Sequence, residues 1–311
     1  MKNTAHAAEG GRLATRAALA SVTLAVCLVV AKGWAAWATG STAMLGSLAD
    51  TALDLIASLT TLAGVRIAAV PADRDHRFGH GKAEALAAMA QVLLIAISAL
   101  AIGWRSVDRL LSGAETGAME LGVGVSVGAI AATLLLLWYQ RRVIARTGSV
   151  AIKTDNLHYK SDLALNLAVI AALVLEQAMG ITGADAFFGL AIAAWLLWGA
   201  WRGSVAAVDQ LMDKEWPDEE RQIFLAAASQ YPELAGLHDL RTRRSGLLRF
   251  VQFHVWVPGD WTVRQAHDRL DRVEEQLQDR FPGTEILIHV DPEGQTDRAT
   301  LLPSDLTERA T

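Results

Sequence analysis

The sequence has a single cysteine, Cys27, among its 311 residues. One thiol forms neither an internal disulfide framework nor a metal-binding thiolate cluster, so we expect neither. An excess of basic residues is also missing, because the formal net charge is −5. A nucleic-acid partner is therefore not expected. A cleavable signal peptide is not expected either, because the apolar run near the start is too long for one.

Long apolar runs are absent after about residue 212, although hydrophobic residues make up 52% of the chain. Before that point, such runs predict six membrane-spanning helices, at about 13–38, 42–69, 83–111, 121–140, 156–179 and 184–208. Each has about 20 residues or more, enough to cross ~30 Å of hydrocarbon. We therefore predict a polar cytoplasmic tail over 1–12, a six-helix transmembrane transport domain over 13–212, and a soluble domain after it.

Basic residues are unevenly distributed among the predicted loops. They gather in the second-to-third loop and the fourth-to-fifth loop, as Arg74, Arg77, Lys82, Arg141, Arg142, Arg146 and Lys153. The first-to-second turn and the fifth-to-sixth loop have none. Because Lys and Arg mark cytoplasmic loops, we expect a multi-pass protein of the cytoplasmic (inner) membrane with both termini in the cytoplasm.

The soluble part has the pattern of a small α+β domain. Pro217 followed by three acids predicts a helix that runs to about residue 229. Alternating side chains predict strands over 238–243, 248–257 and 285–290, with a charged helix over 263–280 before the last strand. The order αββαβ fits a metallochaperone-like sandwich over 213–293. A disordered tail is expected over 294–311.

Two pairs of ionisable residues lie inside the predicted spans. Asp50 and Asp54 are four residues apart, as are His158 and Asp162, so each pair shares one helix face. An ionised carboxylate at mid-membrane costs about 2.5–3.5 kcal/mol on insertion scales. Three carboxylates and one imidazole suit Zn²⁺ or Fe²⁺, and we predict that these four residues hold a divalent cation. Acids hydrogen-bonded to a neighbouring helix, with Lys160 neutralising one of them, are the structural alternative.

His158 adds a proton-exchange function to this prediction. The reference pKa of histidine is about 6.5, so an imidazole changes charge near cytoplasmic pH. Metal binding displaces protons from its ligands. A site that opens alternately to each side of the membrane would therefore exchange metal for protons without ATP.

Two further groups have the spacing of metal ligands. The first is Asp73, His76 and His80 in the loop before the third span, where a solvated polar loop is the alternative. The adjoining Gly79-His80-Gly81-Lys82 lacks the spacing of a Walker A motif, which argues against an ATPase. The second group is in the soluble domain and comprises His238, His254, His267, His289 and Asp291. Core histidines without metal are the alternative there.

Several stretches together resemble the cation diffusion facilitator family, and within it the bacterial pumps that export ferrous iron and zinc. The resemblance covers about residues 15–292. It rests on residues 47–54, on 71–84 with its His76-Arg77-Phe78-Gly79-His80-Gly81-Lys82 core, on 158–162, on 238–243 and on 288–292.

The resemblance implies a homodimer that exports cytoplasmic Zn²⁺ or Fe²⁺, with Cd²⁺ as a further candidate, in exchange for protons. Manganese members of the family tend to lack the histidine, although the sequence alone does not rank Mn²⁺ against the other metals. It implies a tetrahedral transport site of Asp50, Asp54, His158 and Asp162, a loop site, and a two-metal site at the cytoplasmic dimer contact. It also implies a charge interlock between Lys82 and Asp213. Val290 departs from the pattern, because glutamine is expected at its position.

Other functions remain as alternatives or are rejected. A membrane-bound metal sensor or regulatory scaffold would use the soluble sites without any transport. A membrane metalloprotease is rejected, because no H-E-x-x-H motif occurs. We therefore expect a secondary active transporter rather than an enzyme, with metal ions as substrate and regulatory ligand and no cofactor.

Overall fold

The structure, a computed structural model, describes residues 2–39, 42–112, 123–179 and 184–294. The chain forms two compact units, one of residues 11–71 with 82–208, the other of 1–10, 72–81 and 209–311. The loop at 72–81 thus belongs to the same unit as the C-terminal domain. The predicted tail from 294 lies outside the described residues except for Gly294. Parts of the predicted connections at 39–41, 112–121 and 180–183 also lie outside them.

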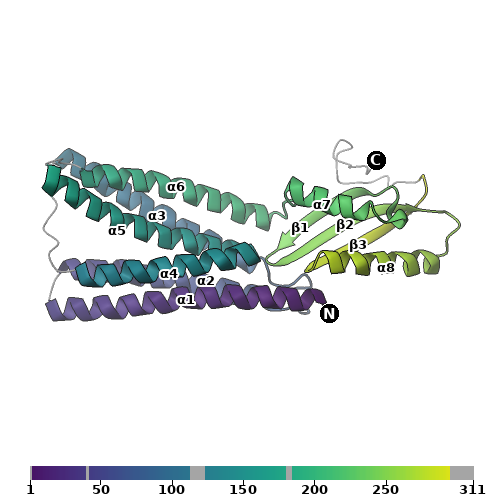
Figure 1. Cartoon of the computed structure of the whole chain (residues 1–311), viewed down its shortest axis with the longest axis horizontal. Helices are drawn as coiled ribbons and strands as arrows, with labels where there is room; N and C mark the ends of the chain where they lie inside the picture. Colours follow the sequence, from purple (N-terminus) through teal and green to yellow (C-terminus); the bar gives the residue numbers. More distant parts are fainter. Residues whose placement is uncertain (1, 40–41, 113–122, 180–183, 295–311) are drawn as a thin grey trace. The chain divides into compact units, whose positions relative to one another are not determined.

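Six long helices make up the N-terminal part of the chain (Figure 1). They are α1 (Lys2–Thr39), α2 (Thr42–Ala68), α3 (Ala83–Ser112), α4 (Val123–Thr147), α5 (Val150–Met179) and α6 (Ala184–Leu211). Helix α1 includes most of the predicted polar tail. Helix α5 begins six residues before its predicted start at 156, because the prediction followed only the apolar part of the helix. Gly148, with φ of 65°, separates α5 from α4.

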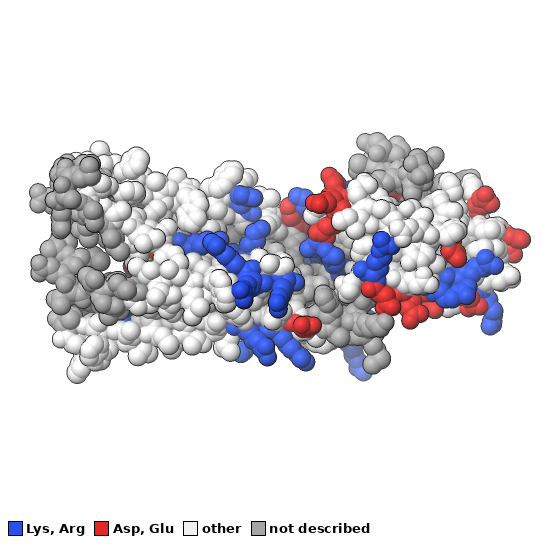
Figure 2. All heavy atoms as spheres, in the orientation of Figure 1, with Lys and Arg blue, Asp and Glu red and all other residues white. Residues whose placement is uncertain are grey.

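Four stretches in these helices are long and apolar enough to cross a membrane, among the described residues. They are Ala8–Ala38, Ser47–Ala68, Ala83–Ser112 and Ala186–Leu211. Charged residues crowd the first half of α5 and the last turns of α4. The prediction of six spans therefore stays a prediction. The face of the helical unit in Figure 2 carries few charged side chains except toward one end.

The helices pack through apolar clusters, and a small one joins α1, α4 and α5 around Leu136, Leu137 and Tyr159. Two further clusters are larger. One cluster joins α1, α2, α4 and α5 around Ala14, Leu62, Val143 and Ile152. The other joins α3 to α6 around Val92, Ile95 and Leu196, with Leu157 of α5 against it. Helices α2 and α3 approach closely, since a Cβ on Gly64 would lie 2.2 Å from Ala87 Cβ.

The C-terminal domain has the predicted order αββαβ, with one added 3₁₀ turn. Its elements are α7 (Asp218–Ala228), η1 (Pro232–Leu234), β1 (His238–Ser245), β2 (Leu248–Val257), α8 (Val263–Arg280) and β3 (Thr284–Pro292). The sheet order is β1-β2-β3, with β1 antiparallel and β3 parallel to β2. Helix α8 makes the crossover that a parallel pair requires.

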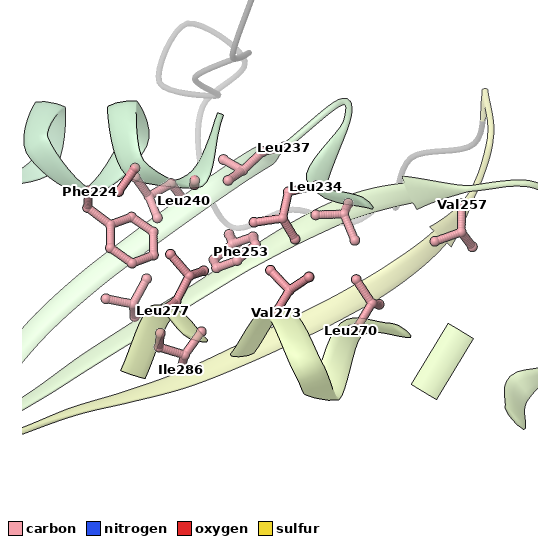
Figure 3. Close-up of a cluster of buried hydrophobic side chains, with 14 of the residues drawn as sticks. Phe224, Leu234, Leu237, Leu240, Phe253, Val257, Leu270, Val273, Leu277 and Ile286 are labelled. Carbon is pink, nitrogen blue, oxygen red and sulfur yellow. The ribbon is translucent and has the colours of Figure 1, made fainter. Parts of the chain in front are cut away.

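One face of this sheet is packed and the other carries polar side chains. On β2, Val251, Phe253, Val255 and Val257 are buried, in alternation with Gln252, His254 and Trp256. Figure 3 shows Leu270, Val273 and Leu277 of α8 against the packed face, with Phe224 of α7 in the same core. Because side chains alternate between faces, His254 and His289 are directed away from this core.

Candidate metal centres

A group of three predicted ligands meets between α2 and α5. Ligand atoms of Asp54, His158 and Asp162 all lie within 4.8 Å of one another. His158 Nε2 is 3.1 Å from Asp54 Oδ1 and 3.7 Å from Asp162 Oδ2. The three side chains are 26%, 12% and 31% exposed, in that order. One imidazole and two carboxylates thus converge in the apolar part of the chain.

The state of His158 Nε2 fits a site for a cation. The atom is buried and makes no well-aligned hydrogen bond within the described part of the chain, although two carboxylates face it. Ionisable side chains that meet inside a membrane helix bundle are expected to be functional. A cation between the imidazole and the two carboxylates would be held by all three. Imidazole and carboxylate are also ligands that Zn²⁺ and Fe²⁺ accept.

Asp50, the fourth predicted ligand, is not part of this group. It lies one turn before Asp54 on α2 and is exposed. The i and i+4 spacing places both acids on one side of the helix, but it separates them by about 6 Å along the axis. The assignment of Asp50 to the transport site stays a prediction.

Hydrogen bonds beside the group hold α5 against α1 and α2. Tyr159 is buried, and its hydroxyl lies 2.9 Å from Ser58 Oγ of α2. The same hydroxyl donates to the carbonyl oxygen of Ser21 on α1 at 2.9 Å. Ser58 is one turn from Asp54, and Tyr159 is next to His158. These bonds fix the rotation of α5 at the level of the site.

Asp155, one turn before His158, was missed in the sequence analysis. It is fully buried, and its carboxylate accepts hydrogen bonds from neutral side chains on three other helices. The donors are Ser21 Oγ at 2.6 Å, Gln140 Nε2 at 2.7 Å and Gln91 Nε2 at 2.9 Å. Asn156 donates to Gln140 Oε1, and Thr61 donates to Gln91 Oε1. The signal in the sequence was Asp155 itself, on the same helical face as His158 and Asp162.

The predicted loop ligands also come together. Asp73, His76 and His80 offer ligand atoms within 4.8 Å of one another. His76 Nδ1 and His80 Nε2 each lie 3.3 Å from a carboxylate oxygen of Asp73. The backbone N–H groups of Asp75 and His76 donate to Asp73 Oδ1, and the bond from His76 holds the pKa of Asp73 below its usual range. Gly79, with φ of 77°, turns the chain so that His80 returns toward Asp73.

This loop is attached to the β1–β2 hairpin. The Arg243 guanidinium lies 4.6 Å from the centre of the Phe78 ring and 4.1 Å from that of Phe250, and the two rings also meet edge to face. A Cβ on Gly81 would lie 2.1 Å from the carbonyl oxygen of Ser245, so only glycine permits this approach. The loop site is therefore anchored to the C-terminal domain.

A third group lies on the polar face of the sheet. His238, His254 and Asp291 offer ligand atoms within 4.8 Å of one another. His254 Nδ1 is 3.0 Å and His238 Nε2 is 3.2 Å from Asp291 Oδ2. The strand register explains this meeting, because His238 pairs with His254 on β2, and Trp256 of β2 pairs with Asp291. His289 pairs with His254, and its Nε2 is 3.5 Å from Asp291 Oδ1.

The surroundings of this third group orient its ligands. His238 Nδ1 lies 2.7 Å from the carbonyl oxygen of Gly236, which fixes the ring and leaves Nε2 directed at Asp291. Asp239, also missed in the sequence analysis, has an Oδ2 3.9 Å from His254 Nε2. Asp239 has φ of 53°, an uncommon value for aspartate, at a register shift in β1. A local backbone irregularity of this kind gives no clear signal in a sequence.

His267 is not part of the third group. It is exposed on α8 and lines a cavity of about 410 Å³ together with Val290, Trp261 and Glu274. Within one copy of the chain, Asp291 is therefore approached by three of the predicted cytoplasmic ligands, His238, His254 and His289, but not by His267. Burial raises the pKa of Glu274, and the carboxylates of Asp271 and Glu285 add to the effect.

The predicted interlock joins residues of different units. Asp213 Oδ1 lies 3.5 Å from Arg243 Nη1, within the C-terminal unit. Lys82 lies at the start of the other unit, next to α3. Their pairing with each other stays a prediction.

Comparisons with known proteins cover nearly the whole chain. The sequence model of the cation efflux transmembrane domain matches residues 18–212, and that of the cation efflux protein cytoplasmic domain matches residues 216–293. The cation-efflux pump FieF of Cronobacter sakazakii (strain ATCC BAA-894) is 42% identical over 282 residues, which cover 91% of this chain and 94% of that protein. FieF of Salmonella typhimurium (strain LT2) gives the same values.

Two solved structures match shorter parts of the chain. The Zn form of CzrB is 39% identical and covers 28% of this chain and 99% of its own, with a TM-score of 0.26. The metal-bound C-terminal domain of CzcD from Thermotoga maritima is 24% identical and covers 26% and 100%, with a TM-score of 0.25. The two domain matches and the 42% identity to FieF over most of the chain show that this membrane protein belongs to the cation efflux, or cation diffusion facilitator, family of metal transporters.

Proposed function

We propose that this protein exports divalent transition-metal cations from the cytoplasm in exchange for protons. Zn²⁺ and Fe²⁺ are the proposed substrates, with Cd²⁺ as a further candidate. The observation that carries the proposal is the convergence of three ionisable groups, in which the buried His158 Nε2 lies 3.1 Å from Asp54 and 3.7 Å from Asp162. Among the similar proteins, FieF is named a cation-efflux pump, and one CzrB structure is of its Zn form.

The chemistry of these side chains supports an exchange of metal ions for protons rather than a one-way movement of metal ions. Carboxylates and an imidazole bind either a metal ion or protons, and each displaces the other. Asp54 lies within the apolar stretch Ser47–Ala68 of α2, where an uncompensated charge is costly. The site therefore favours states in which either metal or protons compensate the carboxylates. We propose Asp50 as the fourth ligand, recruited when metal binds.

The membrane arrangement follows the same proposal. Residues 13–212 form the transport domain with six spans, and residues 213–293 form a cytoplasmic dimerisation domain. Both termini lie in the cytoplasm, and the protein resides in the inner membrane. The apolar character of α1, α2, α3 and α6 and the basic residues at the end of α4 support this arrangement.

The cytoplasmic group is proposed as a regulatory metal site shared between two copies of the chain. His238, His254, His289 and Asp291 come from one copy, and His267 comes from the other. The exposure of His267 and its absence from the group within one copy support this division. Metal at the shared site would draw the two domains together and bias the transmembrane site.

Zinc uptake into proteoliposomes under an imposed pH gradient tests the proposal. Asp54→Ala is expected to abolish transport while the protein stays folded by gel filtration. Asp108→Ala, which removes an exposed acid on α3 outside all three groups, is the control and should transport normally. Transport by Asp54→Ala at the wild-type rate would refute the site assignment. Repeating the assay with each metal ranks the substrates.

A metal sensor without transport is the alternative function, and the third group of ligands favours it. A sensor would lose its response when His254 or Asp291 is changed. It would keep full metal resistance in cells when Asp54 and Asp162 are both replaced by alanine. Loss of resistance in that double variant excludes the sensor.

A further inference from the structure

Helix α1 carries one lysine within its apolar stretch, Ala8–Ala38. Lys32 is the only charged residue between Arg16 and the end of the helix at Thr39. It lies seven residues before that end, which is about 10 Å of helix. An ammonium group this far inside a span is costly on insertion scales, and such residues are retained for function.

The ammonium group of Lys32 is directed toward helix α2. Its Nζ donates a hydrogen bond to Thr51 Oγ1 at 2.6 Å, and Thr51 is only 1% exposed. The Thr51 hydroxyl proton is donated to the Ser47 carbonyl at 3.0 Å, so its oxygen is free to accept from the lysine. A lysine that extends toward the membrane surface would place its charge in water instead.

Thr51 belongs to the acidic stretch of the proposed transport site. It follows Asp50 directly and precedes Asp54 by three residues. Lys32 also interacts electrostatically with Asp162 of α5. The hydrogen bond to Thr51 therefore places the positive charge of α1 beside the stretch of α2 that carries Asp50 and Asp54.

The sum of the charges in the proposed four-ligand site shows what Lys32 contributes. The carboxylates of Asp50, Asp54 and Asp162 contribute −3, and a divalent metal leaves the site at −1. The ammonium of Lys32 brings the metal-loaded site to zero. A neutral loaded site avoids the desolvation cost of a net charge within the membrane.

We infer that Lys32 is the fixed countercharge of the transport site. It partly compensates the carboxylates when the metal has left, and it weakens their hold on the metal so that the ion is released. A transported ion must bind well enough to enter and weakly enough to leave. The inference rests on the proposed function, because it assumes that Asp50, Asp54, His158 and Asp162 together bind the transported metal.

Transport kinetics of the full chain in proteoliposomes, with zinc at mildly alkaline pH, test the inference. Lys32→Met removes the charge and keeps an apolar chain of similar length. We expect its KM to fall, on the order of tenfold for the loss of one nearby charge, and its kcat to fall as release slows. Lys32→Arg keeps the charge and should stay near the wild-type values. Lys153→Met, the same change at an exposed lysine of α5, is the control and should leave KM and kcat at the wild-type values.

Lys32→Gln provides a second variant that keeps a hydrogen-bond donor for Thr51. It should lower KM as Lys32→Met does, and it guards against a folding defect in the methionine variant. An unchanged or raised KM in both folded variants would overturn the inference. Asp54→Ala in the same assay separates the two proposals. Wild-type transport by that variant refutes the site itself, whereas its inactivity together with a wild-type KM for both charge-removing variants refutes only the role of Lys32.

Discussion

At the scale of single residues, α5 carries two buried polar groups in different surroundings. The carboxylate of Asp155 is satisfied by three neutral donors from α1, α3 and α4. His158, one turn later, faces the carboxylates of Asp54 and Asp162. Neutral donors around a carboxylate contribute to the fold, whereas an imidazole and carboxylates are groups that exchange protons for a cation. The difference separates a structural polar network from a binding site on the same helix.

The hydroxyl of Tyr159 should contribute measurably to stability. Tyr159→Phe removes its contacts with Ser58 and Ser21, and we expect a loss of about 0.5–1.5 kcal/mol per hydrogen bond. Thermal unfolding in detergent would show a lowered midpoint. Tyr139→Phe, a half-buried tyrosine of α4, is the matched control and should change it little. Equal effects of the two changes would contradict the role given to Tyr159.

Glu274 should destabilise α8 at neutral pH. Its pKa is raised in the folded protein by burial, so ionisation costs folded stability as the pH rises through that pKa. Glu274→Gln removes this cost and can still accept the hydrogen bond from Gln278. Hydrogen exchange of α8 should therefore be slower in the variant at neutral pH. The difference should vanish at a pH below the unfolded pKa of glutamate.

Glu275→Gln is the control for this measurement, because Glu275 is the exposed neighbour of Glu274. It should leave the exchange of α8 unchanged at both pH values. A benefit of Glu274→Gln that persists at acidic pH would show that burial of the charge is not its cause.

At the scale of elements, the loop at 72–81 depends on a close approach to the β1–β2 turn. Gly81→Val would place side-chain atoms against the Ser245 carbonyl and should detach the loop from the hairpin. Exposed Arg74 and Arg77 should then be cut by trypsin at least several-fold faster. Gly259→Val adds the same side chain where nothing lies within 4 Å and should leave the cleavage rate unchanged.

The predictability of each element follows from how local its determinants are. The strand β2 was predicted within its observed bounds, because alternation of side chains is a local signal. Helix α5 begins six residues before the span predicted from 156, and its first turn is held by contacts of Ala151 and Ile152 with other helices. The partners of Asp155 come from positions up to 134 residues away, so the sequence alone gives no pairing.

The candidate sites were also easier to predict where their determinants are local in the sequence. Spacing identified the ligands of the loop group, which lie within eight residues, and the structure brings all three together. Spacing also placed Asp50 on the same helix face as Asp54. It does not tell which of the two acids approaches His158 and Asp162 on α5. The position of the Asp239 side chain depends on a left-handed backbone conformation at a register shift, and the periodicity of the sequence does not reveal such a conformation.

At the scale of the whole molecule, the proposed shared site makes a prediction about mixed dimers. His254→Ala and His267→Ala each damage both sites of a homodimer. If His267 serves the site of the second copy, a dimer of one variant with the other has one intact site and one doubly damaged site. Differently tagged chains, co-expressed and purified through both tags, should bind about half the wild-type zinc at this position.

Zinc binding by the mixed dimers is best measured in chains that also carry Asp54→Ala and Asp73→Ala, so that the transport group and the loop group do not contribute to the zinc bound. The parent homodimers are the controls and should bind zinc weakly. Zinc binding by the mixed dimer no tighter than by its parents would place His267 outside the partner's site.

The polar face of α5 has a consequence for how the protein is made. Asp155, His158 and Asp162 would meet lipid on a solitary helix, at a cost of several kcal/mol for the acids alone. Such a segment does not partition into the bilayer unaided during synthesis. The helices that supply its donors, α1, α3 and α4, all precede it in translation. The ribosome thus delivers the donors for this segment before the segment itself emerges.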